Sequence, residues 1–309
     1  MKILQFNEPL PAFRHPVVTI GTFDGVHLGH QKIVREIVLL AKKDEADSII
    51  ISFWPHPRHL LQGEQSVALL HTLAEKARHL ENLGVDYLVI IPFSRSFSEL
   101  SAQDYVTDFL IARFHPGRLV IGYDHRFGKN RSGDFALLQQ LQPHFGYALT
   151  EISRESLEHA VISSTQIRNA LHQGNVALAN ALLGYSYSLN GVVIKGDQLG
   201  RKLGFPTANL LPDDAHKLIP SHGVYAVRVR IKAQEYHGVM NIGNRPTVKG
   251  SDLRIEVHLF DFNEDLYGQS MQIQLDAFIR QEKRFDSIDL LKSAIETDCI
   301  QVKNFYKHQ

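Results

Sequence analysis

The sequence predicts an α/β doubly wound parallel sheet, followed by a small antiparallel β-barrel with a C-terminal helix. Two observations support this. Up to about Leu183, short apolar runs rich in β-branched residues alternate with amphipathic segments, as in βαβ units. After Gly184, apolar and polar residues alternate with a period of two, which is typical of antiparallel strands. We therefore expect two domains, residues 1–184 and 185–309.

The composition is that of an ordinary globular protein. The 309 residues include 33 Lys+Arg and 33 Asp+Glu, and 44% are hydrophobic, which excludes a disordered or collagen-like chain. The balanced charge does not favour nonspecific nucleic-acid binding. The single cysteine, Cys299, excludes a disulfide framework. No apolar run approaches the roughly 18 residues of a membrane span, so we expect no membrane partner and a cytoplasmic protein. We also expect it to be monomeric or weakly self-associating and to have no nucleic-acid partner.

The elements of the first domain follow in chain order. Strands are predicted at 17–20, 48–53, 87–91, 118–121 and 147–149, and helices at 33–42 and 72–83. Because strand and helix alternate, right-handed crossovers make the sheet parallel. Ligands of such sheets bind beyond the carboxyl ends of the strands. We therefore expect a ligand site at that edge of the sheet.

The second domain contains mostly strands. They are predicted at 189–194, 224–231, 237–242, 254–260 and 271–278, with a closing helix at 287–306. Turns such as His222-Gly223 and Tyr267-Gly268 separate the strands. Short strands joined in this way are typical of a small barrel.

The segment 21–30 joins a buried strand to a helix and contains three glycines, with His27 and His30 three residues apart. Glycines let backbone N–H groups approach a phosphate, and a helix N-terminus attracts anions. Nucleotidyl transfer needs such donors, because charge builds on the phosphate oxygens and no protein nucleophile is required. Two alternatives stay open: a glycine-rich turn with a helix-capping histidine and, less favoured, a zinc site.

The segment 162–168 places three hydroxyls, of Ser163, Ser164 and Thr165, ahead of Arg168. Serine and threonine before an amphipathic run most often cap a helix, here one beginning near Gln166. Alternatively, Arg168 holds the β- and γ-phosphates of a triphosphate while the hydroxyls donate to it.

The barrel domain opens with a loop at 196–204 that contains three glycines and two cations, which suits a flap over a polyphosphate. Thr207 and Asn209 alternate with Ala208, so both point to one side of an extended segment. A hydroxyl and an amide oxygen are suitable ligands for Mg²⁺. Alternatively, Thr207 only begins a strand and Asn209 ends it.

The run 254–260 also alternates, which places Glu256 and His258 on the face opposite Val257 and Leu259. We expect the face of Glu256 to point toward the barrel interior, where a carboxylate needs a partner or a function. His258 is expected to be a structural hydrogen-bonding residue.

These motifs resemble those of known families. H-x-G-H at 27–30 and I-S-S-T-x-x-R at 162–168 are similar to the signatures of the nucleotidyltransferase superfamily. The segments 52–57 and 122–133 look like the FMN-adenylylating module of prokaryotic bifunctional riboflavin kinase/FAD synthetase. The segment 200–209 resembles G-R-x-L-G-F-P-T-A-N of the riboflavin kinase barrel at every fixed position.

The resemblance implies two reactions that use ATP and Mg²⁺: phosphorylation of riboflavin to FMN, and adenylylation of FMN to FAD with release of pyrophosphate. It implies that His27 and His30 stabilise the α-phosphate and that Glu256 accepts the proton of the ribityl 5′-hydroxyl. The nucleotide-binding residues it implies are Gly21, Phe23, Asp24, Gly25, Gly29, Ser163, Ser164, Thr165, Arg168, Gly196, Gly200, Arg201 and Lys202. The implied flavin-binding residues are Phe53, Pro55, His56, Pro57, Asp124, Arg126 and Asn130. The implied metal ligands are Thr207 and Asn209.

The sequence departs from the family signature at two positions. The family often has an aromatic residue in place of His125 and a basic residue in place of Gln166. The affected contacts would be one to the flavin and one to a phosphate. Two rival functions are a single active module and a flavin-binding sensor without turnover. Either rival function would be indicated by the loss of residues that bind phosphate, but the sequence retains those residues.

Overall fold

The computed structural model of the protein describes residues 1–62, 67–152, 162–247 and 250–308. It contains two compact units, Met1–Ser163 and Ser164–Gln309. Within the described residues, no helix is both long and apolar enough to cross a membrane.

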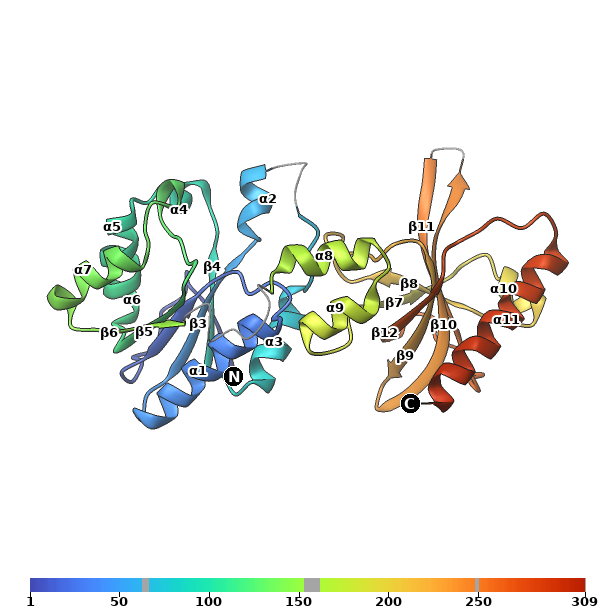
Figure 1. The fold of residues 1–309 in the computed structure, drawn as a ribbon, viewed down its shortest axis with the longest axis horizontal. Helices are drawn as coiled ribbons and strands as arrows, with labels where there is room; N and C mark the ends of the chain where they lie inside the picture. Colours follow the sequence, from blue (N-terminus) through green and yellow to red (C-terminus); the bar gives the residue numbers. More distant parts are fainter. Residues whose placement is uncertain (63–66, 153–161, 248–249, 309) are drawn as a thin grey trace. The chain divides into compact units, whose positions relative to one another are not determined.

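The first unit is built on a six-stranded sheet in which every neighbouring pair is parallel (Figure 1). Its order is β1-β4-β3-β2-β5-β6. The strands are β1 (Lys2–Gln5), β2 (Val17–Ile20), β3 (Ser48–Trp54), β4 (Tyr87–Pro92), β5 (Arg118–Gly122) and β6 (Ala148–Ile152). This confirms the predicted parallel sheet and adds β1, a short edge strand.

Helices cover both faces of this sheet. They are α1 (Leu28–Lys43), α2 (Pro57–Gln62), α3 (Leu73–Asn82), α4 (Arg95–Ser98), α5 (Ala102–Asp104), the π-helical η2 (Tyr105–Ile111), α6 (Ala112–Phe114), the 3₁₀ turn η3 (Lys129–Arg131) and α7 (Phe135–Phe145). Along β3, Ile49 and Ile51 pack with η2 and α7, whereas Ile50 packs with α1 and α3. Because both faces are covered, the strands read as continuous apolar runs. The doubly wound arrangement is confirmed.

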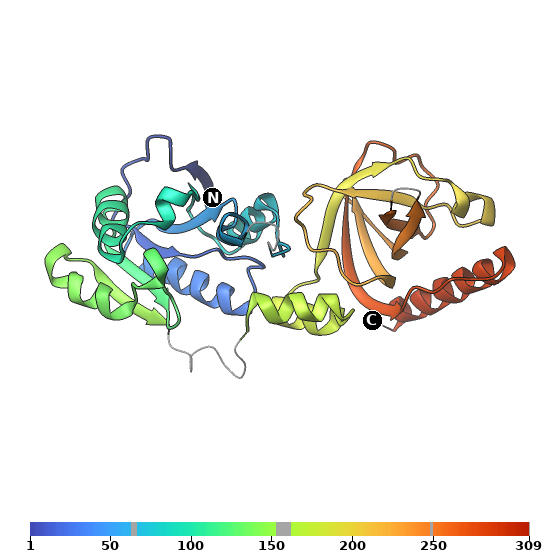
Figure 2. The same cartoon turned by 90° about the horizontal axis from the view of Figure 1, so that it is seen from above.

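The second unit is a closed barrel with the order β10-β11-β8-β7-β12-β9 (Figure 2). All its strand pairs are antiparallel. The strands are β7 (Ser188–Ile194), β8 (Ala208–Pro212), β9 (Gly223–Ile231), β10 (Gln234–Thr247), β11 (Gly250–Leu259) and β12 (Ser270–Arg280). Its helices are α8 (Ser164–His172), α9 (Val176–Leu183), α10 (Leu199–Leu203) and α11 (Ile288–Lys307). The predicted antiparallel barrel and closing helix are confirmed.

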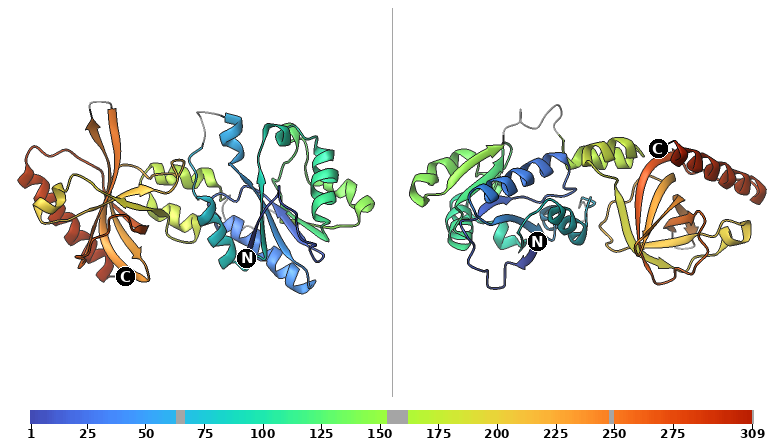
Figure 3. Two further views of the ribbon diagram at one scale, coloured as in Figure 1. Left: turned by 180° about the vertical axis from the view of Figure 1, so that it is seen from behind. Right: turned by 90° about the horizontal axis from the view of Figure 1, so that it is seen from below.

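The C-terminal helix α11 packs on the outside of the barrel (Figures 1 and 3). Val224 of β9 and Val239 of β10 form an apolar cluster with Cys299 and Val302 of α11. Burial raises the pKa of the Cys299 thiol to about 11, so this cysteine is an inert core residue at neutral pH. The barrel therefore has apolar residues on its outer face as well as inside.

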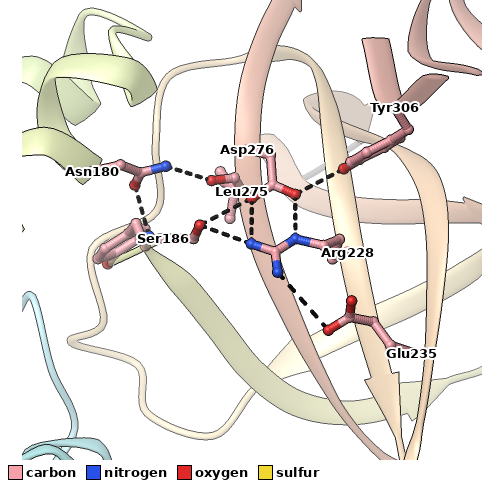
Figure 4. A network of polar contacts seen from close by, with 8 residues as sticks. Asn180, Ser186, Arg228, Glu235, Leu275, Asp276 and Tyr306 are labelled. Carbon is pink, nitrogen blue, oxygen red and sulfur yellow. Dashed lines mark hydrogen bonds and ion pairs between the residues drawn. The ribbon is translucent and has the colours of Figure 1, made fainter. Parts of the chain in front are cut away.

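A polar network fastens α11 to the strands (Figure 4). The carboxylate of Asp276 on β12 accepts hydrogen bonds from Arg228 Nε at 2.8 Å and Nη2 at 2.9 Å. It also accepts from Ser186 Oγ at 3.0 Å and Tyr306 Oη at 2.9 Å. The Tyr306 ring stacks on His237, with ring centroids 3.8 Å apart. One buried carboxylate thus joins β9, β12, α11 and the segment that follows α9.

Helices α8 and α9 are attached to the barrel. Asn180 of α9 donates from Nδ2 to Leu275 O at 2.9 Å, and its Oδ1 accepts the Tyr187 N–H at 2.8 Å. The Ser221 N–H donates to Leu171 O at 3.0 Å. Gly184, in the left-handed conformation with φ 78°, ends α9. These contacts group α8 and α9 with the barrel, and Gly184 lies within the second compact unit.

Candidate active sites

The turn between β2 and α1 has a strained backbone. Phe23 and Val26 have φ angles of 46° and 32°, and Gly25 has 87°. For a β-branched residue such as valine, this region is sterically unfavourable and is populated only when surrounding contacts enforce it. Surrounding contacts therefore hold the turn in this strained conformation.

Two side chains hold the turn. The carboxylate of Asp24, which is buried, accepts the backbone N–H groups of Leu70 at 3.1 Å and His71 at 3.0 Å. Gln31 of α1 donates from Nε2 to Val26 O at 2.9 Å. Asp24 thus lies in the predicted phosphate loop, where its hydrogen bonds connect the loop to the residues before α3.

His27 is the N-cap residue of α1. Its Nδ1 accepts the backbone N–H of His30 at 3.3 Å, which confirms the capping interpretation for this histidine. Because Nδ1 is the acceptor, a neutral His27 carries its ring proton on Nε2. The ring stacks on that of His30 with centroids 3.6 Å apart. The cap therefore fixes which ring nitrogen of a neutral His27 carries the proton.

His30 has a different environment. Its Nδ1 is buried and has no hydrogen-bond partner among the described residues. Burial first, then His27 and Lys76, lower the pKa of His30 well below its usual value, so the ring is neutral at pH 7. Within the described chain, no three His, Cys, Asp or Glu side chains converge as a metal site.

Lys76 on α3 is a member of this region that sequence reasoning missed. It is only 2% exposed, and its Nζ donates to Ser52 Oγ at 3.2 Å. Burial lowers the pKa of Lys76 to about 8, although Asp24 acts in the opposite direction. Its helical spacing could have revealed it, because a lysine at position 76 shares one face with Leu73 and Leu80.

The segment predicted to line the flavin begins at the carboxyl end of β3. Phe53 is buried, with its ring packed against Phe93 and Phe97. Pro55 is exposed and Pro57 is the first residue of α2. The neighbouring His56 is buried, and its Nδ1 accepts the Arg58 N–H at 3.2 Å. Phe53 thus belongs to the hydrophobic core of the first unit.

The second predicted flavin segment follows β5. Asp124, Arg126 and Asn130 are exposed. Arg126 donates from Nη1 to the Asp134 carboxylate at 2.6 Å, and Asn130 adopts a left-handed conformation with φ 55°. Burial lowers the pKa of His125 to about 4, partly opposed by Asp124. These contacts are those of an ordered polar turn.

The hydroxyl-rich segment places Ser163 immediately before α8, which begins at Ser164, two residues earlier than Gln166. Thr165 is exposed, whereas Arg168 is buried on the second turn of the helix. Because the helix begins earlier than predicted, Arg168 lies on its second turn and not on its first.

In the barrel, the glycine loop lies directly against Asn209. A Cβ atom added at Gly196 would lie 2.3 Å from Asn209 Nδ2, so a larger residue there would displace the Asn209 side chain. Asn209 is 5% exposed, and its Oδ1 has no hydrogen-bond partner among the described residues. A Cβ at Gly200 would lie 3.3 Å from Thr207 Oγ1. The loop thus closely covers Thr207 and Asn209.

Glu256 lies in a row of polar residues across three strands. It is paired with Asn209 on β8 and with Asn241 on β10. Asn241 is in turn paired with Val224, which packs against α11 outside the barrel. Directly paired residues share a face of the sheet, so Glu256 is on the outer face. The expectation that it points toward the barrel interior is therefore wrong.

Strand β11 also holds the glycine loop. His258 Nδ1 hydrogen-bonds to Pro206 O at 2.9 Å, which confirms its structural role. Arg254 forms an ion pair with Asp197, with Nη2 and Oδ2 3.7 Å apart. Arg201 and Lys202 are exposed at the end of α10. The structure thus brings Gly196, Thr207, Asn209 and Glu256 together at one place on the outer face.

Two family models match different parts of the chain. Residues 11–166 match the family model of FAD synthetase, and residues 183–306 match that of riboflavin kinase. A bifunctional riboflavin kinase/FMN adenylyltransferase of Escherichia coli (strain K12) is 40% identical over 94% of this chain and 92% of its own. Its counterpart from Listeria monocytogenes is 34% identical over 99% of this chain and 98% of its own.

A solved structure described as a macrolide-efflux protein from Streptococcus pneumoniae is 31% identical, with a TM-score of 0.87. The match covers 98% of this chain and 99% of that one. We take from it the fold alone.

The folds and motifs define a transferase with two ATP-using modules. The chain belongs to the family of bifunctional riboflavin kinase/FMN adenylyltransferases. It phosphorylates riboflavin to FMN with ATP, and it adenylylates FMN with a second ATP, giving FAD and pyrophosphate.

Proposed function

We propose that FMN is adenylylated at the turn between β2 and α1, and that riboflavin is phosphorylated on the outer face of the barrel around Glu256. The observation that carries this assignment is common to both places. Each glycine-bearing loop lies beside a buried polar atom without a partner among the described residues, His30 Nδ1 in one and Asn209 Oδ1 in the other. Buried polar atoms normally have a partner, so a ligand is the expected one.

In adenylyl transfer, a phosphate oxygen of FMN attacks the α-phosphorus of ATP, and pyrophosphate leaves. His27, with its proton on Nε2, and the neutral His30 donate hydrogen bonds to the α-phosphate oxygens where charge builds. The N-terminus of α1 adds partial positive charge. The residues we assign to this nucleotide are Gly21, Phe23, Asp24, Gly25, Gly29, Ser163, Ser164, Thr165 and Arg168.

In riboflavin phosphorylation, the ribityl 5′-oxygen attacks the γ-phosphorus of ATP, and ADP leaves. Glu256 accepts the proton of that hydroxyl as the bond forms. Its partly exposed place beside Asn209 supports this role, because the base must be accessible to the hydroxyl of the substrate and close to the proposed metal ligand. Gly196, Gly200, Arg201 and Lys202 form the flap over the polyphosphate.

We further propose that Thr207 and Asn209 hold Mg²⁺. The buried Asn209 Oδ1 fits this role, since an amide oxygen is a suitable ligand for a hard cation. The ion would neutralise polyphosphate charge at this site. In the first module, the flavin would be lined by Phe53, Pro55, His56, Pro57, Asp124, Arg126 and Asn130.

The setting of the enzyme is also a proposal. We propose that it acts in the cytoplasm as a monomer or a weakly self-associating protein, without a nucleic-acid partner. The balanced charge of 33 Lys+Arg against 33 Asp+Glu supports the last point.

A direct test of the pair of reactions is an incubation of riboflavin, ATP and Mg²⁺ with the purified chain, separated by chromatography. We expect FMN and then FAD. FMN alone would argue against activity in the first module, and neither product would favour a flavin-binding protein without turnover.

Replacing Asn209 by Ala is expected to raise the Mg²⁺ concentration needed for half-maximal riboflavin phosphorylation by at least about tenfold, because it removes a ligand and leaves the base. Titration of the initial rate of FMN formation with Mg²⁺ measures this. Asn263→Ala, at an exposed asparagine beyond β11, is the matched control. An unchanged Mg²⁺ titration in Asn209→Ala would remove this residue from the metal site.

We propose that the activities separate near Gly184, with residues 1–184 adenylylating FMN and residues 185–309 phosphorylating riboflavin.

A fragment 164–309 is expected to be more stable than 185–309 by at least about 2 kcal/mol, since the shorter one loses both hydrogen bonds of Asn180. Urea unfolding followed by circular dichroism measures the difference. Equal free energies of unfolding would show that α8 and α9 do not stabilise the barrel, and a folded 185–309 fragment without kinase activity would contradict the separation.

A further inference from the structure

Lys76 is a buried cation beside the turn of residues 21–30. Its exposure is 2%, and its Nζ lies 5.9 Å from the ring centroid of Trp54 and 3.2 Å from Ser52 Oγ. Buried lysines are rare, because an ammonium loses much hydration energy on burial. A hydroxyl and an aromatic face compensate this loss only in part. A lysine kept in such a place therefore requires a functional explanation.

Lys76 is connected to the backbone of the turn through Ser52. The Ser52 hydroxyl donates to Thr22 O at 3.3 Å, and it accepts from Lys76 Nζ. An ammonium can only donate, so the direction of the chain of bonds is fixed: Lys76 to Ser52 to Thr22. Thr22 immediately precedes Phe23, whose φ is 46°. The lysine thus supports the strained part of the turn.

The charge of Lys76 also acts on His30. The titratable groups that act on His30 are His27 and Lys76, and both disfavour its protonated form. The carboxylate that acts on Lys76 is that of Asp24, which is itself bonded to Leu70 and His71. A positive charge in a site of low dielectric attracts an incoming phosphate more strongly than one in water.

We propose that Lys76 is a positioning residue for adenylyl transfer, which holds the backbone of the turn through its hydrogen bond to Ser52. The proposal rests on the assignment of adenylyl transfer to the turn of residues 21–30. Neither the glycine-histidine motif nor the hydroxyl-arginine motif includes this lysine.

The first test compares Lys76→Met with Lys76→Arg. Lys76→Met is expected to lower kcat for FAD formation roughly 10- to 100-fold, as misplacement of catalytic groups does, and Lys76→Arg is expected to keep most of it. Riboflavin phosphorylation by the same preparation should stay within about twofold, because its proposed groups lie in the other unit. Lys32→Met, at an exposed lysine of α1, is the matched control.

The second test is pH dependence. Since the pKa of Lys76 is about 8, FAD formation by the unmodified enzyme should decline as the pH rises through about 8. Lys76→Arg should lose this decline, because an arginine stays charged. Removing the cation in Lys76→Met should raise the pKa of His30, measured by NMR titration of its imidazole, because Lys76 disfavours the protonated ring. His30→Ala identifies that signal.

The outcomes separate the proposal from its premise. The proposal is overturned if Lys76→Met keeps both the wild-type kcat and the wild-type titration of His30. It is also overturned if Lys76→Arg loses as much activity as Lys76→Met while the pKa of His30 does not change, because that result indicates a packing effect alone. If His30→Ala also adenylates FMN normally, the site assignment itself fails. If near-ultraviolet circular dichroism shows Lys76→Met unfolded, Ser52→Ala decides: slower FAD formation supports the proposal, and a wild-type rate overturns it.

Discussion

Replacing Glu256 by Gln is expected to slow riboflavin phosphorylation by roughly 10² to 10⁴ while riboflavin binding survives, the usual cost of losing a general base. Glutamine keeps the shape of glutamate but cannot accept a proton as a carboxylate does. Glu256 is partly exposed and is paired in register with Asn209, so a neutral side chain there should not disturb the barrel core. The effect should therefore fall on the chemical step.

The measurement is the initial rate of FMN formation at saturating riboflavin and ATP, with riboflavin affinity followed by flavin fluorescence. FAD formation from supplied FMN is the internal control. Glu264→Gln, at an exposed glutamate in the turn before β12, is the matched variant. Unaltered kinase kinetics in Glu256→Gln would move the base role to another group. A large change in riboflavin affinity would instead indicate a binding role.

The effect of Glu256→Gln differs in kind from that of Asn209→Ala. Losing the base lowers kcat at any Mg²⁺ concentration, whereas losing a metal ligand is overcome by more Mg²⁺. Glu256 on β11 and Asn209 on β8 are opposite one another. A substitution that merely distorted the structure around them would therefore change both kcat and the Mg²⁺ requirement. Separate effects would therefore support separate roles.

Most of the fold could be predicted because both patterns are local. The parallel strands are buried on both faces and read as apolar runs, and barrel strands such as β7 and the first half of β12 alternate between buried and less buried residues. The edge strand β1 escaped because its residues are mostly exposed. The helical run at 102–114 escaped because its middle, η2, is π-helical: the buried Tyr105, Phe109 and Phe114 recur at a longer spacing than the 3.6 residues of an α-helix.

The packing of α8 and α9 could not be read from the sequence. It depends on hydrogen bonds of Asn180 to Leu275 and Tyr187, and the bond to Leu275 joins residues 95 positions apart. A change of periodicity marks where one kind of element ends, not which unit a helix packs against. The same limit applies to the partner of Lys76: helical spacing places this lysine on the buried face of α3, but Ser52, to which it donates, is 24 residues away.

The orientation of Glu256 shows a second limit. Alternation tells which residues share a face, but not which face is inside. In this barrel α11 covers part of the outer face, so Val224 and Phe260 are buried there while Val257 is buried on the opposite side. Burial of one residue set therefore does not identify the interior. The interior is identified by following the register of the strands from a residue that packs against α11, such as Val224.

Replacing His30 by Ala is expected to slow FAD formation by roughly 10² to 10³, the usual cost of removing one donor to a transition state. Riboflavin phosphorylation should be unchanged. The helix cap should survive, because the bond to His27 Nδ1 comes from the backbone N–H of residue 30 and not from its ring. The His30 Nδ1 has no partner among the described residues, so no described hydrogen bond of that atom is lost.

Steady-state kinetics can separate catalysis from folding in this one variant. Loss of a transition-state donor lowers kcat and kcat/KM together, whereas loss of ground-state binding raises KM alone. Initial rates of FAD formation over a range of FMN and ATP concentrations distinguish the two, and the thermal unfolding midpoint checks the fold. His144→Ala, at an exposed histidine of α7, is the matched control. If His30→Ala adenylates FMN at nearly the wild-type rate, the ring serves only the packing of the helix start, and the assignment of the site must be given up.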